Sequence, residues 1–91
     1  MRYYIQDTRS YLGDAVMWWR PNGEGYTSDI DDAGEYEEAE AVRICRSRST
    51  EKAIPVDVAR AAIVRVVYAG HLHRAMEARA LVIDAPAGGG Q

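Results

Sequence analysis

Ninety-one residues with a mass of 10.1 kDa suffice for one small folded domain and leave no room for a second. Hydrophobic residues make up 47% and charged residues 27%, which excludes a fully disordered chain. The formal net charge is only −3, and the single cysteine, Cys45, excludes an internal disulfide and a multi-cysteine metal site.

The first half of the chain carries three predicted strands. Residues 2–8 and 15–20 are rich in strand-forming side chains, and a glycine-containing turn separates them. The breaker cluster 21–25 ends the second strand, and residues 26–30 form the third. Short connections of this kind predict an antiparallel meander.

The paired tryptophans belong to the second of these strands. Because side chains alternate along a strand, Val16 and Trp18 share one face, while Met17 and Trp19 share the other. We therefore expect one tryptophan in the core and the other outside it or under a neighbouring element.

A helix is predicted over residues 35–47. Its glutamates lie at the beginning and its arginines at the end, which matches the helix dipole. An apolar stripe on this helix consists of Ala41, Val42, Ile44 and Cys45.

The sequence after Pro55 supports two interpretations. Apolar spacing predicts a short helix over 55–62, and the β-branched run 63–68 predicts a fourth strand, with a single helix over 55–69 as the alternative. A last helix is predicted over 71–82.

Together these elements predict one α+β domain over residues 1–84, followed by a flexible glycine-rich tail over 85–91. In it, a three- to four-stranded antiparallel sheet packs one face against the 35–47 helix, with one or two further helices toward the C-terminus. The expected core comprises Val16 or Met17, one tryptophan, Ile30, Val42 and Cys45.

The stretch from Tyr3 to Arg48 resembles a group of small phage and prophage proteins. The resemblance is carried by the opening Tyr3-Tyr4-Ile5-Gln6-Asp7-Thr8-Arg9-Ser10-Tyr11, the pair Trp18-Trp19, the turn Gly25-Tyr26-Thr27 and the acidic segment from Asp29 to Tyr36. It implies a phage-borne accessory protein, and genes of this kind often lie among inhibitors of host systems, anti-CRISPR proteins included. The group offers no catalytic signature.

No metal, cofactor or catalytic site is expected. The segment from Asp29 to Glu40 matches much of an EF-hand calcium loop, but Ala33 stands at a ligand position and a strand is predicted to precede it. His71 and His73 lack a third zinc ligand nearby and are interpreted as surface residues. Neither a nucleophile motif nor a complete dinucleotide-binding loop is present, so we expect no enzyme.

The leading hypothesis is binding to a host protein through an acidic face. Residues 24–42 contain eight acidic side chains and no basic one, a block that could occupy a basic groove by occlusion or by imitating nucleic acid. The predicted contact residues are the acidic Asp29, Asp31, Asp32, Glu35, Glu37 and Glu38 and the aromatic Tyr26, Tyr36 and Trp19.

The alternative is a small nucleic-acid-binding regulator that uses an arginine-rich face of Arg43, Arg46, Arg48 and Arg60. A sequence pI near 5.3 argues against direct nucleic-acid binding. We expect no membrane partner and a cytoplasmic location, because no apolar run approaches the ~20 residues of a membrane span and no signal peptide is evident.

Overall fold

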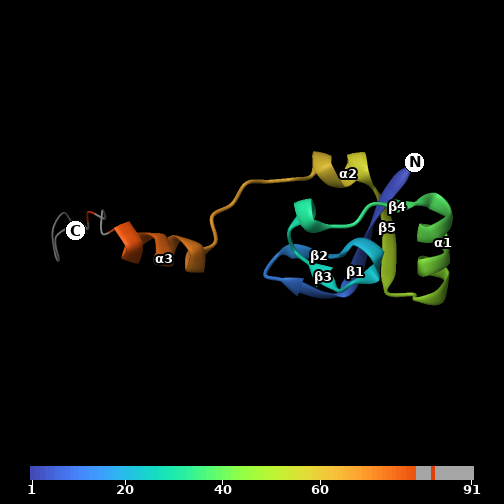
Figure 1. Cartoon of the computed structure of the whole chain (residues 1–91), viewed down its shortest axis with the longest axis horizontal. Coiled ribbons are helices and arrows are strands. Elements are labelled where there is room, and N and C mark those ends of the chain that lie inside the picture. The colour runs from blue at the N-terminus through green and yellow to red at the C-terminus, as the bar shows by residue number, and fades with distance from the viewer. Residues whose placement is uncertain (80–82, 84–91) are drawn as a thin grey trace.

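The computed structural model describes residues 1–79 and 83, and it confirms the predicted α+β class (Figure 1). A curled antiparallel sheet carries two helices, one against each face. These elements, residues 1–62, are called the body, and the chain then leaves the body toward a third helix. The elements in order are β1 (Arg2–Leu12), β2 (Ala15–Trp19), η1 (Pro21–Gly23), β3 (Tyr26–Thr27), η2 (Ile30–Asp32), β4 (Tyr36–Glu37), α1 (Glu38–Ser47), β5 (Glu51–Pro55), α2 (Val56–Ala61) and α3 (Ala69–Arg79).

Strand β1 is the centre of the sheet. Tyr3 pairs with both β4 and β5, and Asp7 pairs with both β2 and β5, so β5 lies along one edge of β1 while β2 and β4 share the other. Strand β3 continues the sheet beyond β2. The register between β1 and β2 shifts between Asp7 and Tyr11, and such an irregularity bends and twists a strand.

The two faces of the sheet bury two separate apolar clusters. Between α1 and the sheet lie the buried residues Ile5 and Tyr36 and, from the helix itself, Ala41, with Tyr3, Trp19, Ile44 and Ala53 packed against them. Between α2 and the other face lie Tyr4 and Trp18 and, from the helix itself, Ala59, with Val16, Ile30, Ala33, Ile54 and Val56 packed against them. The predicted alternation is confirmed, because Trp18 is buried under α2 while Trp19 is partly buried on the α1 face.

The predicted core was therefore only partly right. A single-sided core was expected, but Val16 and Ile30 pack on the face opposite α1. Val42 is exposed, because α1 turns Ala41 and Ile44 toward the sheet instead.

Several predicted element boundaries were wrong. The helix begins at Glu38 rather than at residue 35, because Tyr36 pairs with Tyr3 as a strand. Strand β3 ends at Thr27, and residues 30–32 form a 3₁₀ turn. Strand β5 was not predicted at all.

The C-terminal half departs further from expectation. Helix α2 agrees with the predicted 55–62 segment, but residues 63–68 form neither a strand nor a continuation of that helix. Helix α3 starts two residues earlier than predicted, and the glycine-rich tail at 85–91 lies outside the described residues. No helix in the described part is both long enough and apolar enough to cross a bilayer.

The backbone at residue 34 passes very close to the backbone of residues 19–21. The amide of Gly34 donates a hydrogen bond to the carbonyl of Trp19 at 2.9 Å. A side chain at residue 34 would meet the Pro21 backbone at 2.7 Å, so only glycine fits at this crossing.

Candidate functional site

The six acidic residues predicted to bind a partner are all exposed. We call them the acidic ridge: Asp29, Asp31, Asp32, Glu35, Glu37 and Glu38. Their segment runs from η2, near α2, past the N-terminus to the first turn of α1 (Figure 1). The ridge therefore extends from the α2 side of the sheet, where Asp31 pairs with Arg60, to the α1 side, where Glu38 begins the helix.

Two arginines from distant parts of the sequence partly neutralise the acidic ridge. Arg2 pairs with Glu35 at 3.3 Å and with Glu37 at 2.6 Å, and Arg60 of α2 pairs with Asp31 at 3.5 Å. Exposed ion pairs of this kind contribute little to stability and exchange readily with water or with a partner. Six carboxylates against two guanidinium groups leave the ridge acidic.

Local contacts fix the shape of the acidic ridge at both ends. The carboxylate of Asp29 accepts the amide of Asp31 at 2.9 Å, which starts the η2 turn. At the other end, the Tyr3 hydroxyl donates to Glu38 at 3.2 Å. Neither interaction removes a carboxylate from solvent.

Tyr36 is not available as an apolar anchor. It is only 4% exposed, with its ring packed under α1, and its hydroxyl donates to the carbonyl of Arg20 and accepts the amide of Gly23 at 3.0 Å. Burial raises the pKa of the Tyr36 hydroxyl above its ordinary value. Its role is to hold the loop that follows β2.

Trp19 and Tyr26 lie among arginines. Their rings meet edge to face at 6.3 Å between centroids. The guanidinium of Arg48 lies 5.7 Å from the Trp19 ring centroid, and that of Arg9 lies 6.0 Å from the Tyr26 centroid. A hollow of about 100 Å³ opens between Trp19, Tyr26 and Arg48.

Two buried carboxylates lie beneath this aromatic pair, and the sequence did not reveal them. Asp7 and Glu51 face each other across β1 and β5 and are 3% and 4% exposed. Asp7 accepts two hydrogen bonds at 3.0 Å from the Arg9 side chain, while Glu51 accepts the Trp19 indole N–H at 3.4 Å and the Thr50 hydroxyl. The available signal was an acidic residue two positions after Ile5, on the same face of a predicted strand.

Replacing Arg9 with methionine is expected to lower the melting temperature at pH 7. Hydrogen bonds from Arg9 hold the pKa of Asp7 below its ordinary value, so the pair stabilises the fold above about pH 4. That stabilisation is lost as the pH falls through the folded-state pKa. Thermal melts at several pH values should therefore show wild type and variant converging in acid. Arg43→Met is the control, because Arg43 is exposed and lies 3.9 Å from Glu40; an equal loss there would contradict the assignment.

The predicted arginine-rich face does not form as one surface. Arg43 and Arg46 lie on α1 and Arg48 directly follows it, whereas Arg60 lies on α2, across the sheet. Arg60 also pairs with the acidic ridge and lies 5.8 Å from the Tyr4 ring centroid.

The other residues considered for a reactive or metal-binding site are the cysteine and the two histidines. Burial raises the pKa of the Cys45 thiol, so little thiolate is present at neutral pH. His71 and His73 are exposed on α3, where His73 lies 3.4 Å from Glu77. Within residues 1–79 and 83, no three metal-ligating side chains cluster together.

Comparisons with protein families, with curated proteins and with solved structures find no match to this chain.

Proposed function

We propose that this protein is a non-enzymatic, phage-borne accessory protein that binds and inhibits a host protein through the acidic ridge. The observation that carries the proposal is the exposure of all six ridge carboxylates along one stretch of chain with only Arg2 and Arg60 as ion-pair partners among the described residues. The partner is a protein with a basic groove, such as a nucleic-acid-binding component of a defence complex of the CRISPR type.

The mechanism is occlusion of that groove or imitation of its nucleic acid. Carboxylates along an exposed segment present a row of negative charge, as phosphates do along a strand. Such complementarity mainly raises the association rate, and salt weakens it. Tyr26, which is exposed, and the partly buried Trp19 remain available as apolar contacts, whereas Tyr36 does not.

A non-enzymatic role is consistent with how the buried acidic groups are used. Asp7 and Glu51 are the buried carboxylates of the described residues, and both are engaged in internal hydrogen bonds. These internal hydrogen bonds give both carboxylates a structural role that accounts for their burial.

Charge reversal on the ridge tests the proposal. The tagged protein first captures its partner from a nuclease-treated host lysate, and the association rate is then measured with the purified partner. Changing Asp31, Asp32, Glu37 and Glu38 to lysine is expected to lower that rate at least tenfold, because the steering field is inverted. Wild-type association should also slow as salt is added.

The matched control carries the same change in net charge elsewhere. Asp14, Glu24, Asp57 and Glu77 are exposed and lie outside the acidic ridge, so their reversal to lysine should preserve most of the binding. Equal losses in both variants would mean that net charge matters and the ridge does not. Circular dichroism must show that both variants are folded.

A second candidate is nucleic-acid binding, favoured by the two arginines that lie over Trp19 and Tyr26. Capture that disappears after nuclease treatment, and that is lost when Arg43, Arg46 and Arg48 become alanine, would favour this function over the acidic ridge.

A further inference from the structure

The loop after β2, residues 21–25, contains the only asparagine of the chain, Asn22, directly before Gly23. Asparagine followed by glycine is the pair most prone to spontaneous deamidation, because glycine has no side chain to hinder attack by its own backbone nitrogen. All five residues of the loop are exposed, so water reaches them. Residue type and exposure together therefore mark Asn22 as a site of chemical modification.

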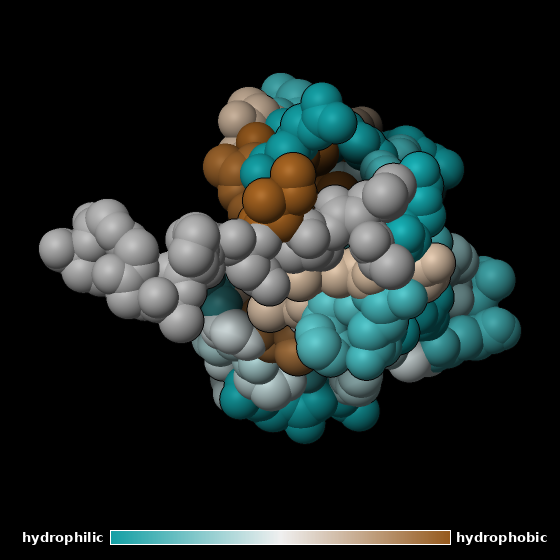
Figure 2. All heavy atoms as spheres, turned by 90° about the vertical axis from the view of Figure 1, so that its left-hand side faces the viewer, coloured by the Kyte–Doolittle hydropathy of each residue, from teal (hydrophilic) through white to brown (hydrophobic). Residues whose placement is uncertain are grey.

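The C-terminal part of the chain does not cover this loop. Residues 63–79, here called the arm, leave the body at the end of α2 and run away from it (Figure 1). Figure 2 looks along the arm and shows apolar surface open to solvent beside hydrophilic surface. Any protection of Asn22 must therefore come from the body itself.

Deamidation needs a free Gly23 nitrogen close to the side chain of Asn22. That nitrogen loses its proton and attacks the side-chain amide carbon. The new N–C bond closes a succinimide ring, and the side-chain nitrogen leaves as ammonia. Water then opens one of the two ring C–N bonds and leaves an aspartate or an isoaspartate at position 22. Water is the only co-reactant, and nothing is oxidised or reduced.

The folded backbone turns the Gly23 nitrogen away from the Asn22 side chain. Asn22 has a φ of 60° and a ψ of 22°, which is the left-handed conformation. At so small a ψ the Gly23 nitrogen nearly eclipses the backbone nitrogen of Asn22, whereas ring closure requires that it eclipse the β-carbon. The backbone must therefore rotate at Asn22 before the ring can form.

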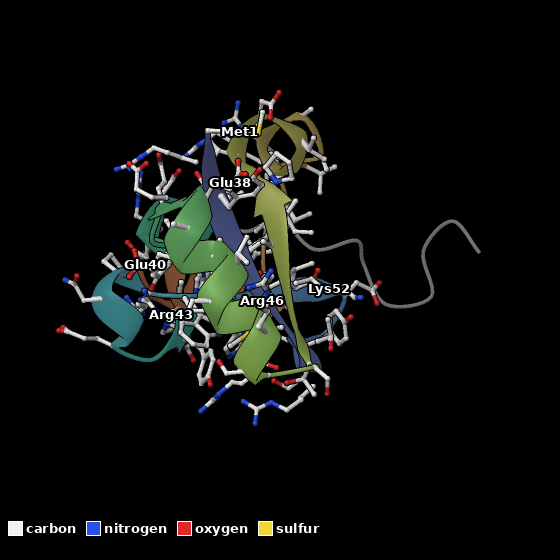
Figure 3. All side chains as sticks on the ribbon, turned by 90° about the vertical axis from the view of Figure 1, so that its right-hand side faces the viewer. Met1, Glu38, Glu40, Arg43, Arg46 and Lys52 are labelled. Atoms are coloured by element: carbon white, nitrogen blue, oxygen red, sulfur yellow. The ribbon has the colours of Figure 1, made fainter. Side chains whose placement is uncertain are left out.

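A hydrogen bond holds the same nitrogen. The Gly23 amide donates to the Tyr36 hydroxyl at 3.0 Å, and this hydroxyl donates in turn to the carbonyl of Arg20. Burial raises the pKa of Tyr36, so its hydroxyl stays protonated and does not remove the Gly23 proton. Tyr36 cannot swing aside, because α1 covers this face of the sheet (Figure 3) and the Tyr36 backbone pairs with Tyr3.

We propose that Asn22 is a deamidation site that the fold protects, and that the Tyr36 hydroxyl controls its reactivity. Reaction then requires local opening of the loop and loss of the bond between Gly23 and Tyr36. Either product adds a negative charge directly before the acidic stretch 24–42. Isoaspartate also lengthens the backbone by one carbon, so the bonds from Arg20 to Gly25 and from Gly23 to Tyr36 no longer fit together. A transient opening thus becomes a permanent change in the loop.

Incubation of the full chain in mildly alkaline buffer tests protection by the fold. Mass spectrometry of a peptide that contains Asn22 measures the replacement of the side-chain nitrogen by oxygen, and no other asparagine contributes. Folded wild type is expected to deamidate at least about tenfold more slowly than the same chain unfolded in urea. Equal rates in the two states would refute the proposal.

Tyr36→Phe isolates the role of the hydroxyl. This variant is expected to deamidate about three- to tenfold faster than folded wild type, which is the effect of one lost hydrogen bond on the frequency of loop opening. Ile5→Val is the matched control, because it lowers the stability of the same buried cluster and removes no hydrogen bond from the loop. Equal acceleration in both variants at equal loss of melting temperature, or none in Tyr36→Phe, would overturn the assignment to Tyr36.

Hydrogen exchange in wild type covers the case of a Tyr36→Phe chain that does not fold. Exchange of the Gly23 amide reports the opening of its bond to Tyr36 directly. We expect this amide to be protected, and the protection to be insensitive to low urea concentrations, because local opening exposes little surface. Deamidation should slow by at least as large a factor, since it also needs the rotation at Asn22. An unprotected amide, or protection that falls with urea as global stability does, would refute control by the loop.

Discussion

Replacing Trp18 with alanine is expected to lower the free energy of unfolding by about 3–5 kcal/mol. Trp18 is buried under α2, where its ring lies 5.5 Å from that of Tyr4 between centroids and packs against Ala59. Truncation removes most of the filling of this cluster, and the neighbouring backbone in β1 and β3 prevents its collapse. Domains of this size have total stabilities of only about 5–10 kcal/mol, so this single truncation should remove a large share of the total.

Urea denaturation followed by far-ultraviolet circular dichroism measures this loss. Tyr11→Ala is the control, because Tyr11 is an aromatic residue of the same sheet that is exposed, and its removal should cost less than about 1 kcal/mol. Similar losses in the two variants would mean that the α2 face is not a core.

Replacing Gly34 with alanine is expected to destabilise the body by about 3 kcal/mol, at the upper end of the usual cost of overpacking. The new methyl group would lie 2.7 Å from both the nitrogen and the α-carbon of Pro21, and backbone atoms cannot rotate aside as a flexible side chain does. The chain would have to separate at this point, which also strains the hydrogen bond from Gly34 to Trp19.

The control is a glycine with open space around it. At Gly70, in α3, the nearest atom to a new methyl group is the end of the Arg74 side chain at 3.8 Å. Gly70→Ala should therefore leave the melting temperature of the body unchanged and favour the helix locally. If Gly34→Ala melts at the wild-type temperature, the crossing is looser than the structure indicates.

The local sequence pattern was sufficient to predict the first two strands and most of α1. The alternation of side chains along a strand predicted that Trp18 and Trp19 lie on opposite faces of the sheet. It did not predict which of the two would be buried, because that depends on where α2 packs. The acidic residues before α1 suit a helix start, yet Tyr36 is drawn into a strand by its pairing with Tyr3. Non-local pairing of this kind leaves no trace in a short window of sequence.

Residues 51–55 and 63–68 show why strand propensity alone misleads. Glu51-Lys52-Ala53-Ile54-Pro55 has a single β-branched residue and still forms β5, because β1 offers it a complete ladder. The valine-rich 63–68 segment has high propensity and no such neighbour in the body. A strand is defined by its partner as much as by its own residues.

The acidic ridge could be predicted from the sequence because a run of carboxylates without basic neighbours is costly to bury, whereas the single carboxylates of Asp7 and Glu51 are buried. The counterions of the ridge could not be predicted, since Arg2 and Arg60 are distant from it along the chain. The same holds for the aromatic residues: Tyr36 and Tyr26 look alike in sequence, and only the fold buries the first and exposes the second.

The position of β1 between β2 and β5 also sets the order in which this protein can fold during synthesis. Strand β1 is made before the other strands of this sheet, and it needs a neighbour that is made some 50 residues later, since Tyr3 pairs with Pro55. Until then one edge of β1 is open and Ile5 has no cover from that side. A nascent chain ending near Arg48 therefore exposes the centre of its sheet, and is the species most in need of a chaperone. Once Ala61 has emerged, every strand of the body is present and the sheet can close before the arm is complete.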